Sequence, residues 1–133
     1  MLEALKQLNI EQLLGEVAAL KGTDHRFVTI TCRDAGETHE LTYHFDKDYK
    51  LTNLRINSPK GTVLPSMSSV FFAAVIVENE IKDLFGIDFS GLAIDYKGRF
   101  ILSDGAPKAP MNKTHGIGVD ARIKASGNKE GSV

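Results

Sequence analysis

Three carboxylates near the middle of the chain have a spacing that could serve chemistry or recognition. Glu80 and Asp83 lie three positions apart, so on a helix their side chains would share one face. Two carboxylates on one face could cooperate in acid–base catalysis, or they could meet cationic groups of a partner protein. Glu78 and Lys82, four positions apart, have the spacing of an ordinary stabilising helix pair. We favour partner binding for Glu80 and Asp83 and keep acid–base catalysis as the alternative.

The histidines do not have the spacing of a metal site. His39 and His44 lie in one segment that alternates as a β-strand, and their separation of five positions directs them to opposite faces. His25 and His115 are expected in loops. The sequence therefore predicts no metal centre.

Motifs for nucleophiles and phosphate groups are also weak. Cys32 lies in the middle of a predicted strand on its apolar side, which is typical of a small core residue. Ser66 and Ser68 lack the glycines of a nucleophile elbow and are typical of a helix start. Gly116 and Gly118 lack the preceding strand and following helix of a phosphate-binding loop. The residues alone thus indicate no convincing active site.

Composition narrows the class of protein. A length of 133 residues suits one domain, and a net charge of −1 gives no electrostatic case for nucleic acid or anionic lipid as the main partner. The single cysteine excludes an internal disulfide and a multi-cysteine zinc or iron–sulfur site within the chain, and it favours the reducing cytosol. The longest apolar run, residues 70–77, is too short to cross a bilayer, and the N-terminus lacks the pattern of a signal peptide. We therefore expect any membrane association to come through partners.

The segment Ser66–Gly86 (SMSSVFFAAVIVENEIKDLFG) predicts one long central helix. Pro65 cannot continue a helix backwards, Ser66 can accept hydrogen bonds from the first free backbone N–H groups, and Gly86 can adopt the left-handed conformation that ends a helix. One face carries an apolar stripe suited to a core, formed by Val70, Ala73, Ala74, Val77, Ile81 and Leu84.

Further apolar residues project from the other side of this predicted helix. They are Phe71, Phe72, Val75 and Ile76. Because one sheet covers only one side of a helix, we expect a second body to cover them, either another part of this chain or a partner protein. A fully buried central helix is the alternative.

Residues 2–21 predict a second helix, with a looser first turn. Its apolar positions are Leu5, Leu8, Leu13, Leu14, Val17 and Leu20. Asn9 and Gln12 form a plausible capping box, which would start the main part of the helix at Ile10, and Gly22 would close it.

Three alternating segments between the two helices predict β-strands. They are residues 26–33, 38–45 and 50–57, with turn residues between them. In the first, Val28, Ile30 and Cys32 would share the apolar side. In the third, a regular alternation would place Leu51 on the opposite side from Leu54 and Ile56. This predicts a bulge near Thr52 or Asn53.

The short connections favour an antiparallel meander. The predicted fold class is therefore α+β: an antiparallel sheet of three to five short strands packed against an N-terminal helix and a long central helix, with an extended C-terminal tail. Residues 62–64 and 100–102 are candidates for additional short strands.

The composition changes after residue 104. Residues 105–133 are rich in glycine and small polar residues, so we expect a domain at 1–104 followed by a tail that cannot fold alone. The tail is either disordered or an arm that becomes ordered on a partner. Its apolar anchors would be Met111, Ile117, Val119 and Ile123.

The stretch from Pro65 to Ile87 resembles the signature of the 30 kDa subunit of respiratory complex I and of its counterparts in energy-converting membrane-bound [NiFe] hydrogenases. That signature has a Pro-Ser start, an alanine before the acidic part, then Glu-Arg-Glu, two residues, Asp, two apolar residues and Gly. The matching residues here are Glu78, Glu80, Asp83, Leu84, Phe85, Gly86 and Ile87. The strand segments also resemble the sheet of this family, so the similarity spans roughly residues 10–104.

Two positions depart from the family pattern. Asn79 stands where the family usually has arginine, and residues 88–96 (DFSGLAIDY) replace the expected His-Pro-x-Leu-x-Arg run. These departures favour the short hydrogenase-type subunit over the quinone-reducing type.

The resemblance implies a non-redox accessory and assembly subunit in the peripheral arm of a membrane-bound oxidoreductase. Such a subunit would dock to the catalytic large subunit and the iron–sulfur small subunit and would meet the membrane arm only indirectly. It would bind no cofactor itself, because the iron–sulfur clusters, and the NiFe centre of a hydrogenase, would lie in partner subunits. It would be cytoplasmic, at the peripheral face of the cytoplasmic membrane.

The expected partner contacts come from two sources. The resemblance implies Glu78, Glu80 and Asp83, and the apolar pattern adds Phe71, Phe72, Val75, Ile76 and Met111. Two other hypotheses stay open. One is a stand-alone enzyme that uses Glu80, Asp83 and a histidine such as His44, and the other is a small soluble adaptor unrelated to redox chemistry.

Overall fold

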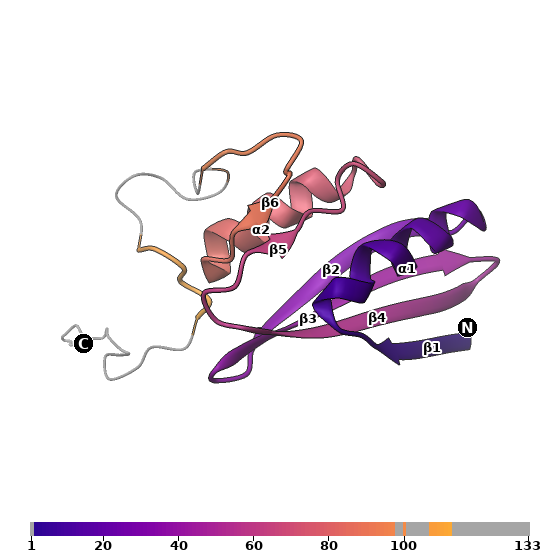
Figure 1. The fold of residues 1–133 in the computed structure, drawn as a ribbon, viewed down its shortest axis with the longest axis horizontal. Coiled ribbons are helices and arrows are strands. Elements are labelled where there is room, and N and C mark those ends of the chain that lie inside the picture. The colour runs from indigo at the N-terminus through magenta and orange to yellow at the C-terminus, as the bar shows by residue number, and fades with distance from the viewer. Residues whose placement is uncertain (1, 98–99, 101–106, 113–133) are drawn as a thin grey trace.

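The computed structural model describes residues 2–97, 100 and 107–112 (Figure 1). Along the chain the elements are β1 (Leu2–Gln7), α1 (Ile10–Gly22), β2 (Arg26–Asp34), β3 (Thr38–Lys47), β4 (Lys50–Pro59), β5 (Leu64–Pro65), α2 (Ala74–Phe85) and β6 (Phe89–Ser90). The predicted α+β class is confirmed, and so are the three central strands.

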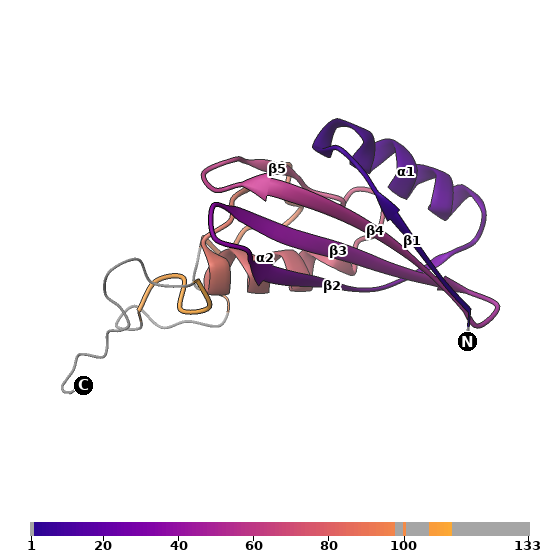
Figure 2. The same cartoon turned by 90° about the horizontal axis from the view of Figure 1, so that it is seen from below.

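Four strands form the main sheet, in the order β1-β4-β3-β2 (Figure 2). β2, β3 and β4 make the predicted antiparallel meander, while β1 pairs in parallel with β4 at the edge. The sheet is therefore mixed. The tip between β3 and β4 is a tight turn in which Asp48 and Tyr49 both have positive φ, 53° and 65°.

The prediction of a helix over residues 2–7 is wrong, because these residues form β1. The ladder to β4 places Leu5 opposite Asn53 and continues with a 2.8 Å hydrogen bond from the Leu8 backbone N–H to the Arg55 carbonyl. The helix begins at Ile10 instead, after the predicted Asn9–Gln12 capping box, in which the Asn9 N–H donates to Gln12 Oε1 over 2.9 Å. Pairing with a distant strand thus outweighs the helical spacing of the leucines.

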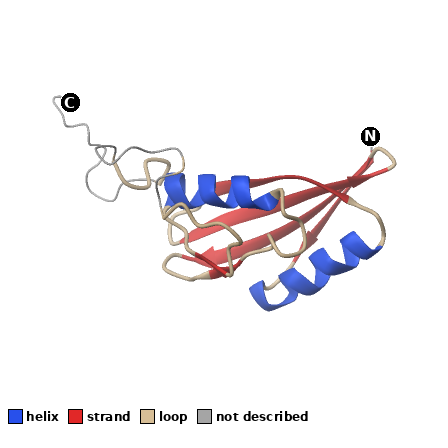
Figure 3. Ribbon diagram, turned by 90° about the horizontal axis from the view of Figure 1, so that it is seen from above, coloured by secondary structure: helices blue, strands red, loops and turns tan. Residues whose placement is uncertain are grey.

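One face of the sheet carries the core. Leu41, Tyr43, Phe45 and Ile56 on this face have no exposed surface. Both helices cover this face, with Leu13 and Val17 buried from α1 and Ala74 and Ile81 from α2. In Figure 3 the two helices lie over different parts of the sheet. The other face is polar.

The bulge lies in β2 and not in β4, contrary to the expected bulge near Thr52 or Asn53. The pairing of β2 with β3 shifts between Phe27 and Thr29, whereas β4 pairs with β3 without interruption. The shift turns Phe27 toward the core, where its ring lies 5.9 Å from that of Phe45, and leaves Val28 49% exposed. Val28 therefore does not share the apolar side as expected.

The central helix is shorter than predicted, because α2 begins at Ala74 and not at Ser66. The backbone between them makes turns, in which Val70 and Phe71 both donate to the Met67 carbonyl. The end of the helix is as predicted: Gly86 has a φ of 72°, and its N–H donates to the Lys82 carbonyl.

A second, two-stranded parallel sheet lies beside α2. It joins β5 to β6, so that Leu64 is opposite Phe89. The expected short strand at residues 62–64 overlaps β5 at one residue. Of the expected strand at 100–102, only Phe100 lies within the described residues, and it is a bend.

Candidate functional site

The apolar residues expected to face a second body divide into two pairs. Phe72, in the turn before α2, is 63% exposed, and Ile76, in the first turn of α2, is 56% exposed. Val75 is only 4% exposed. The ring of Phe71 packs 5.5 Å from that of Phe45, and the ammonium group of Lys21 lies 5.0 Å from the centre of the Phe71 ring. This chain itself therefore covers Phe71 and Val75 and leaves Phe72 and Ile76 facing outward.

Glu78 is fully buried and bonded within the chain. Ser66 Oγ donates to its Oε1 over 2.6 Å, and the Met67 N–H donates to its Oε2 over 2.9 Å. Burial raises the pKa of Glu78, and these two hydrogen bonds oppose that shift. Because Ser66 gives its only hydroxyl proton to Glu78, Ser68 donates to Ser66 Oγ over 2.8 Å and in turn accepts the Ala93 N–H over 3.0 Å.

The expected pair of Glu78 with Lys82 is wrong. Lys82 forms ion pairs with Asp88 and Asp95, each at 3.3 Å. Glu78 faces the inside of the molecule, whereas Lys82 lies at the side of α2 where the chain returns after the helix. The spacing of the two residues suits a pair, but the tertiary packing gives each of them a different partner.

Asn79 is also fully buried, and it holds the chain that follows α2. Its Nδ2 donates to the Val75 and Ile94 carbonyls, both at 2.8 Å, and its Oδ1 accepts the Tyr96 N–H over 3.0 Å. Asn79 and the segment 88–96 are the two places where the sequence departs from the signature. The structure joins them directly, since the side chain of one is bonded to the backbone of the other.

The residues of the stand-alone enzyme hypothesis are not brought together. Asp83 is 3% exposed, while Glu80 is half-buried on the outer part of α2. His44 lies on the polar face of the sheet, away from both helices, with its Nε2 3.0 Å from Thr31 Oγ1 and its Nδ1 2.6 Å from Asn53 Oδ1. That face carries a shallow groove of about 270 Å³, lined by Leu5, Thr31, Thr42, His44, Asn53 and Arg55.

The remaining chemical candidates are part of the core. Burial, with a contribution from Asp34, raises the pKa of Cys32 to about 12, which keeps its thiol protonated. Tyr43 is fully enclosed, and burial raises its pKa. His39 packs edge-on against Phe85, on the opposite face from His44 as predicted. Among residues 2–97, 100 and 107–112, no three His, Cys, Asp or Glu side chains are grouped as metal ligands.

The described part of the predicted tail, residues 107–112, packs against the end of α2. The Met111 N–H donates to the Leu84 carbonyl and Asn112 Nδ2 donates to the Phe85 carbonyl, both over 2.7 Å. Because a carbonyl can only accept, the amide oxygen of Asn112 must face His39, and it accepts the proton on His39 Nε2 over 2.7 Å. The Met111 side chain remains 56% exposed. Sequence reasoning missed the role of Asn112, because no local pattern marks it.

A comparison with protein families identifies the family of this chain. The family model of the respiratory-chain NADH dehydrogenase 30 kDa subunit matches residues 6–119. The chain belongs to this family. The match includes α1, β2 to β6 and α2, and it confirms the resemblance of residues 65–87. The family is named for a subunit of the respiratory-chain NADH dehydrogenase.

A solved structure has the same fold as this 30 kDa subunit family member. It is a chain of the membrane-bound sulfane sulfur reductase, an archaeal respiratory membrane complex, with a TM-score of 0.72 and 18% sequence identity. The alignment covers 79% of this chain and 66% of that chain. No curated protein sequence shows significant similarity to the chain. Within the described residues, no helix is long and apolar enough to cross a membrane.

Proposed function

We propose that this chain is a non-redox accessory and assembly subunit of the peripheral arm of a membrane-bound oxidoreductase, of the energy-converting hydrogenase type. It docks to the catalytic large subunit and the iron–sulfur small subunit through the outer face of α2. It meets the membrane arm only through these partners, on the cytoplasmic side. The observation that carries the proposal is the exposure of Phe72 and Ile76, 63% and 56%, at the start of a helix whose other side chains are buried or half-buried.

An exposed pair of large apolar side chains favours a surface that binds a partner protein over one that stays in contact with water. Large apolar side chains that lie together on a surface are typical of interaction sites, and aromatic residues often dominate the binding energy. Phe72 and Ile76 lie four positions apart at the start of α2 and come from the same stretch that carries the family signature. A partner that covers them would remove both from water.

The internal chemistry of the chain supports an accessory role. Glu78 is bonded to Ser66 and Met67, and Cys32 remains a protonated thiol at neutral pH. We therefore assign the iron–sulfur clusters, and the NiFe centre if the complex is a hydrogenase, to the partner subunits. The similarity of fold to a chain of an archaeal respiratory membrane complex supports membership in a complex of that kind.

The proposal is tested by purifying the native complex from cells that express a tagged copy of this chain. Phe72→Asp and Ile76→Asp place a charge where apolar contact is expected, and both should sharply reduce the amount of large and iron–sulfur subunits that co-purify. Tyr49→Asp is the matched control, because Tyr49 is 82% exposed at the far hairpin tip. Full recovery of both partner subunits with both α2 variants would refute the proposal.

A further inference from the structure

A second exposed apolar pair lies on the chain that follows α2. Ile94 and Tyr96 are each 44% exposed, although both belong to a segment whose backbone is bonded to the helix. The Tyr96 ring packs against Phe100 with 4.8 Å between the ring centres. Ile94 and Tyr96 are therefore exposed on a segment whose backbone is held on α2.

Two buried side chains hold this segment against α2 and the turns before it. Asn79 binds the Ile94 carbonyl and the Tyr96 N–H, and Ser68 accepts the Ala93 N–H. Ile76 precedes Asn79 by three positions, so the two side chains are neighbours on the helix. The segment bonded to Asn79 thus runs next to Ile76.

Together the four exposed side chains form what we call the α2 apolar surface: Phe72, Ile76, Ile94 and Tyr96. A surface of four large, roughly half-exposed apolar side chains has an area on the order of a few hundred Å², the size at which such patches in monomers are often functional. Phe72 and Ile76 come from the start of α2, whereas Ile94 and Tyr96 come from the segment that follows the helix. The surface therefore exists only when residues 93–96 are held on α2.

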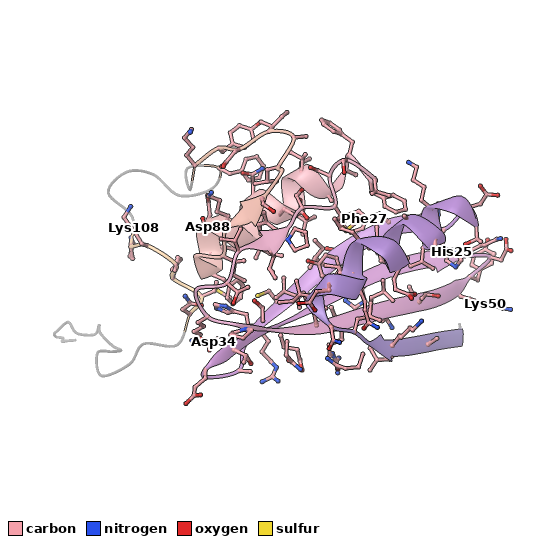
Figure 4. The ribbon with its side chains drawn as sticks, viewed as in Figure 1. His25, Phe27, Asp34, Lys50, Asp88 and Lys108 are labelled. Carbon is pink, nitrogen blue, oxygen red and sulfur yellow. The ribbon has the colours of Figure 1, made fainter. Side chains whose placement is uncertain are left out.

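The edge of this surface is acidic. Glu80 lies one turn after Ile76 and, within the described part of the chain, forms no ion pair. Asp88 and Asp95 both form ion pairs with Lys82, Asp95 also interacts with Lys97, and the Asp88 side chain remains 67% exposed beside β6 (Figure 4). The complementary partner surface is therefore apolar and carries positive charge.

We infer that Asn79 and Ser68 position the segment 93–96 so that Ile94 and Tyr96 join Phe72 and Ile76 in one docking surface. The occupant is an apolar segment of a partner subunit that presents a lysine or arginine to Glu80. This inference rests on the proposed function. It adds Ile94 and Tyr96 to the surface that contacts the partner subunit, and it adds the charge of that partner. Asn79 is a positioning residue here, since its own side chain is fully buried.

The first test places charges on the second half of the surface. In the native complex, Ile94→Asp and Tyr96→Asp should each reduce co-purifying partner subunits about tenfold, the effect of losing one apolar contact of moderate strength. Tyr49→Asp again serves as the control. If Phe72→Asp disrupts the complex while Ile94→Asp and Tyr96→Asp leave it intact, this inference fails and the proposed function stands. If none of these variants disrupts it, both fail.

The second test separates positioning from folding. Asn79→Ala in the full chain should increase hydrogen exchange at the Tyr96 amide and weaken partner retention, while the amides of β3 keep their protection. Ser68→Ala removes the bonds to Ala93 and to Ser66 but leaves both bonds of Asn79 to the segment, so it should give a smaller change at Tyr96 in the same direction. Unchanged exchange at Tyr96 in Asn79→Ala, or normal partner retention despite faster exchange there, would overturn the positioning role.

The third test concerns the charge of the partner. Glu80→Lys should weaken retention of the partner subunits more than Glu80→Gln does, and the difference should shrink as salt is added, because exposed charges are screened. Equal or stronger retention with Glu80→Lys would overturn the assignment of a cationic partner group.

Discussion

Ser66 Oγ lies 2.6 Å from Glu78 Oε1, across twelve positions of sequence. Ser66 is predicted to start the helix, but it lies before α2 and donates a hydrogen bond to the carboxylate of Glu78 within α2. The Met67 N–H, 2.9 Å from the other oxygen, completes the arrangement, so the chain before α2 is fastened to the buried side of α2. This connection joins the turns before α2 to the helix itself.

Removal of the Ser66 hydroxyl should destabilise the protein. Ser66→Ala leaves the buried Glu78 carboxylate without one of its two described donors, which costs about 1–3 kcal/mol in the free energy of unfolding. Urea denaturation of the full chain measures this. Ser69→Ala is the control, because Ser69 is exposed. A loss for Ser66→Ala no larger than that for Ser69→Ala would contradict the role of the hydrogen bond.

Glu78 should make stability fall as the pH rises. Its pKa in the folded protein is raised above the ordinary value of 4.5, so the folded state binds more protons than the unfolded state between the two values. The stabilisation from this group is complete below 4.5 and is lost as the pH rises through the folded pKa. The free energy of unfolding of the wild type minus that of Glu78→Gln should therefore decrease from about pH 4.5 upward.

Denaturation of both proteins over a pH series measures this difference, and the ionisable groups that they share largely cancel in it. A difference that increases with pH would show that the two hydrogen bonds outweigh burial and that the pKa of Glu78 is lowered.

Asn112 should stabilise the end of α2. Asn112→Ala removes the donor to the Phe85 carbonyl and the acceptor for His39 Nε2, and we expect a loss of about 1–3 kcal/mol in unfolding free energy. Met111→Ala is the matched control, since its exposed side chain is removed while its backbone bond to Leu84 remains. Equal stability of the two variants would mean that the contacts of Asn112 contribute little.

Tyr49 should be a position where glycine improves stability. Its φ of 65° lies in the left-handed region, which costs about 1 kcal/mol for a residue with a Cβ atom, and its side chain is 82% exposed, so little packing is lost. Tyr49→Gly should raise the free energy of unfolding by about 0.5–1 kcal/mol, whereas Tyr49→Ala should not. The result is read from urea or thermal denaturation, and a destabilised glycine variant would contradict it.

Much of the fold could be predicted because its signals are local. The alternation of residues 26–33, 38–45 and 50–57, the Asn9–Gln12 capping box and the glycine at position 86 each involve neighbours within a few residues. The family signature of residues 65–87 is likewise a continuous stretch, and the match to the 30 kDa subunit family confirms it. The exposure of Phe72 and Ile76 agrees with the apolar pattern on the outer side of the predicted helix.

The errors have one common cause. Residues 2–7 have helical spacing but form a strand, because β4 offers them a ladder. Leu51 does not fit the alternation of Leu54 and Ile56, which suggests a bulge in β4, but the bulge lies in β2 at Val28. Spacing pairs Glu78 with Lys82, yet each is bonded to a segment that lies outside the helix. In each case a contact between distant parts of the chain decides the outcome.

The sequence by itself determined the three meander strands, the end of α2, the family and the presence of excess apolar residues on the central helix. Only the tertiary structure decided which of those residues face outward and that Asn79 fastens the backbone of Ile94 and Tyr96 to α2. The physical reason is that periodicity and capping act between near neighbours, whereas a buried polar group must find its hydrogen-bond partner wherever the packed chain provides one.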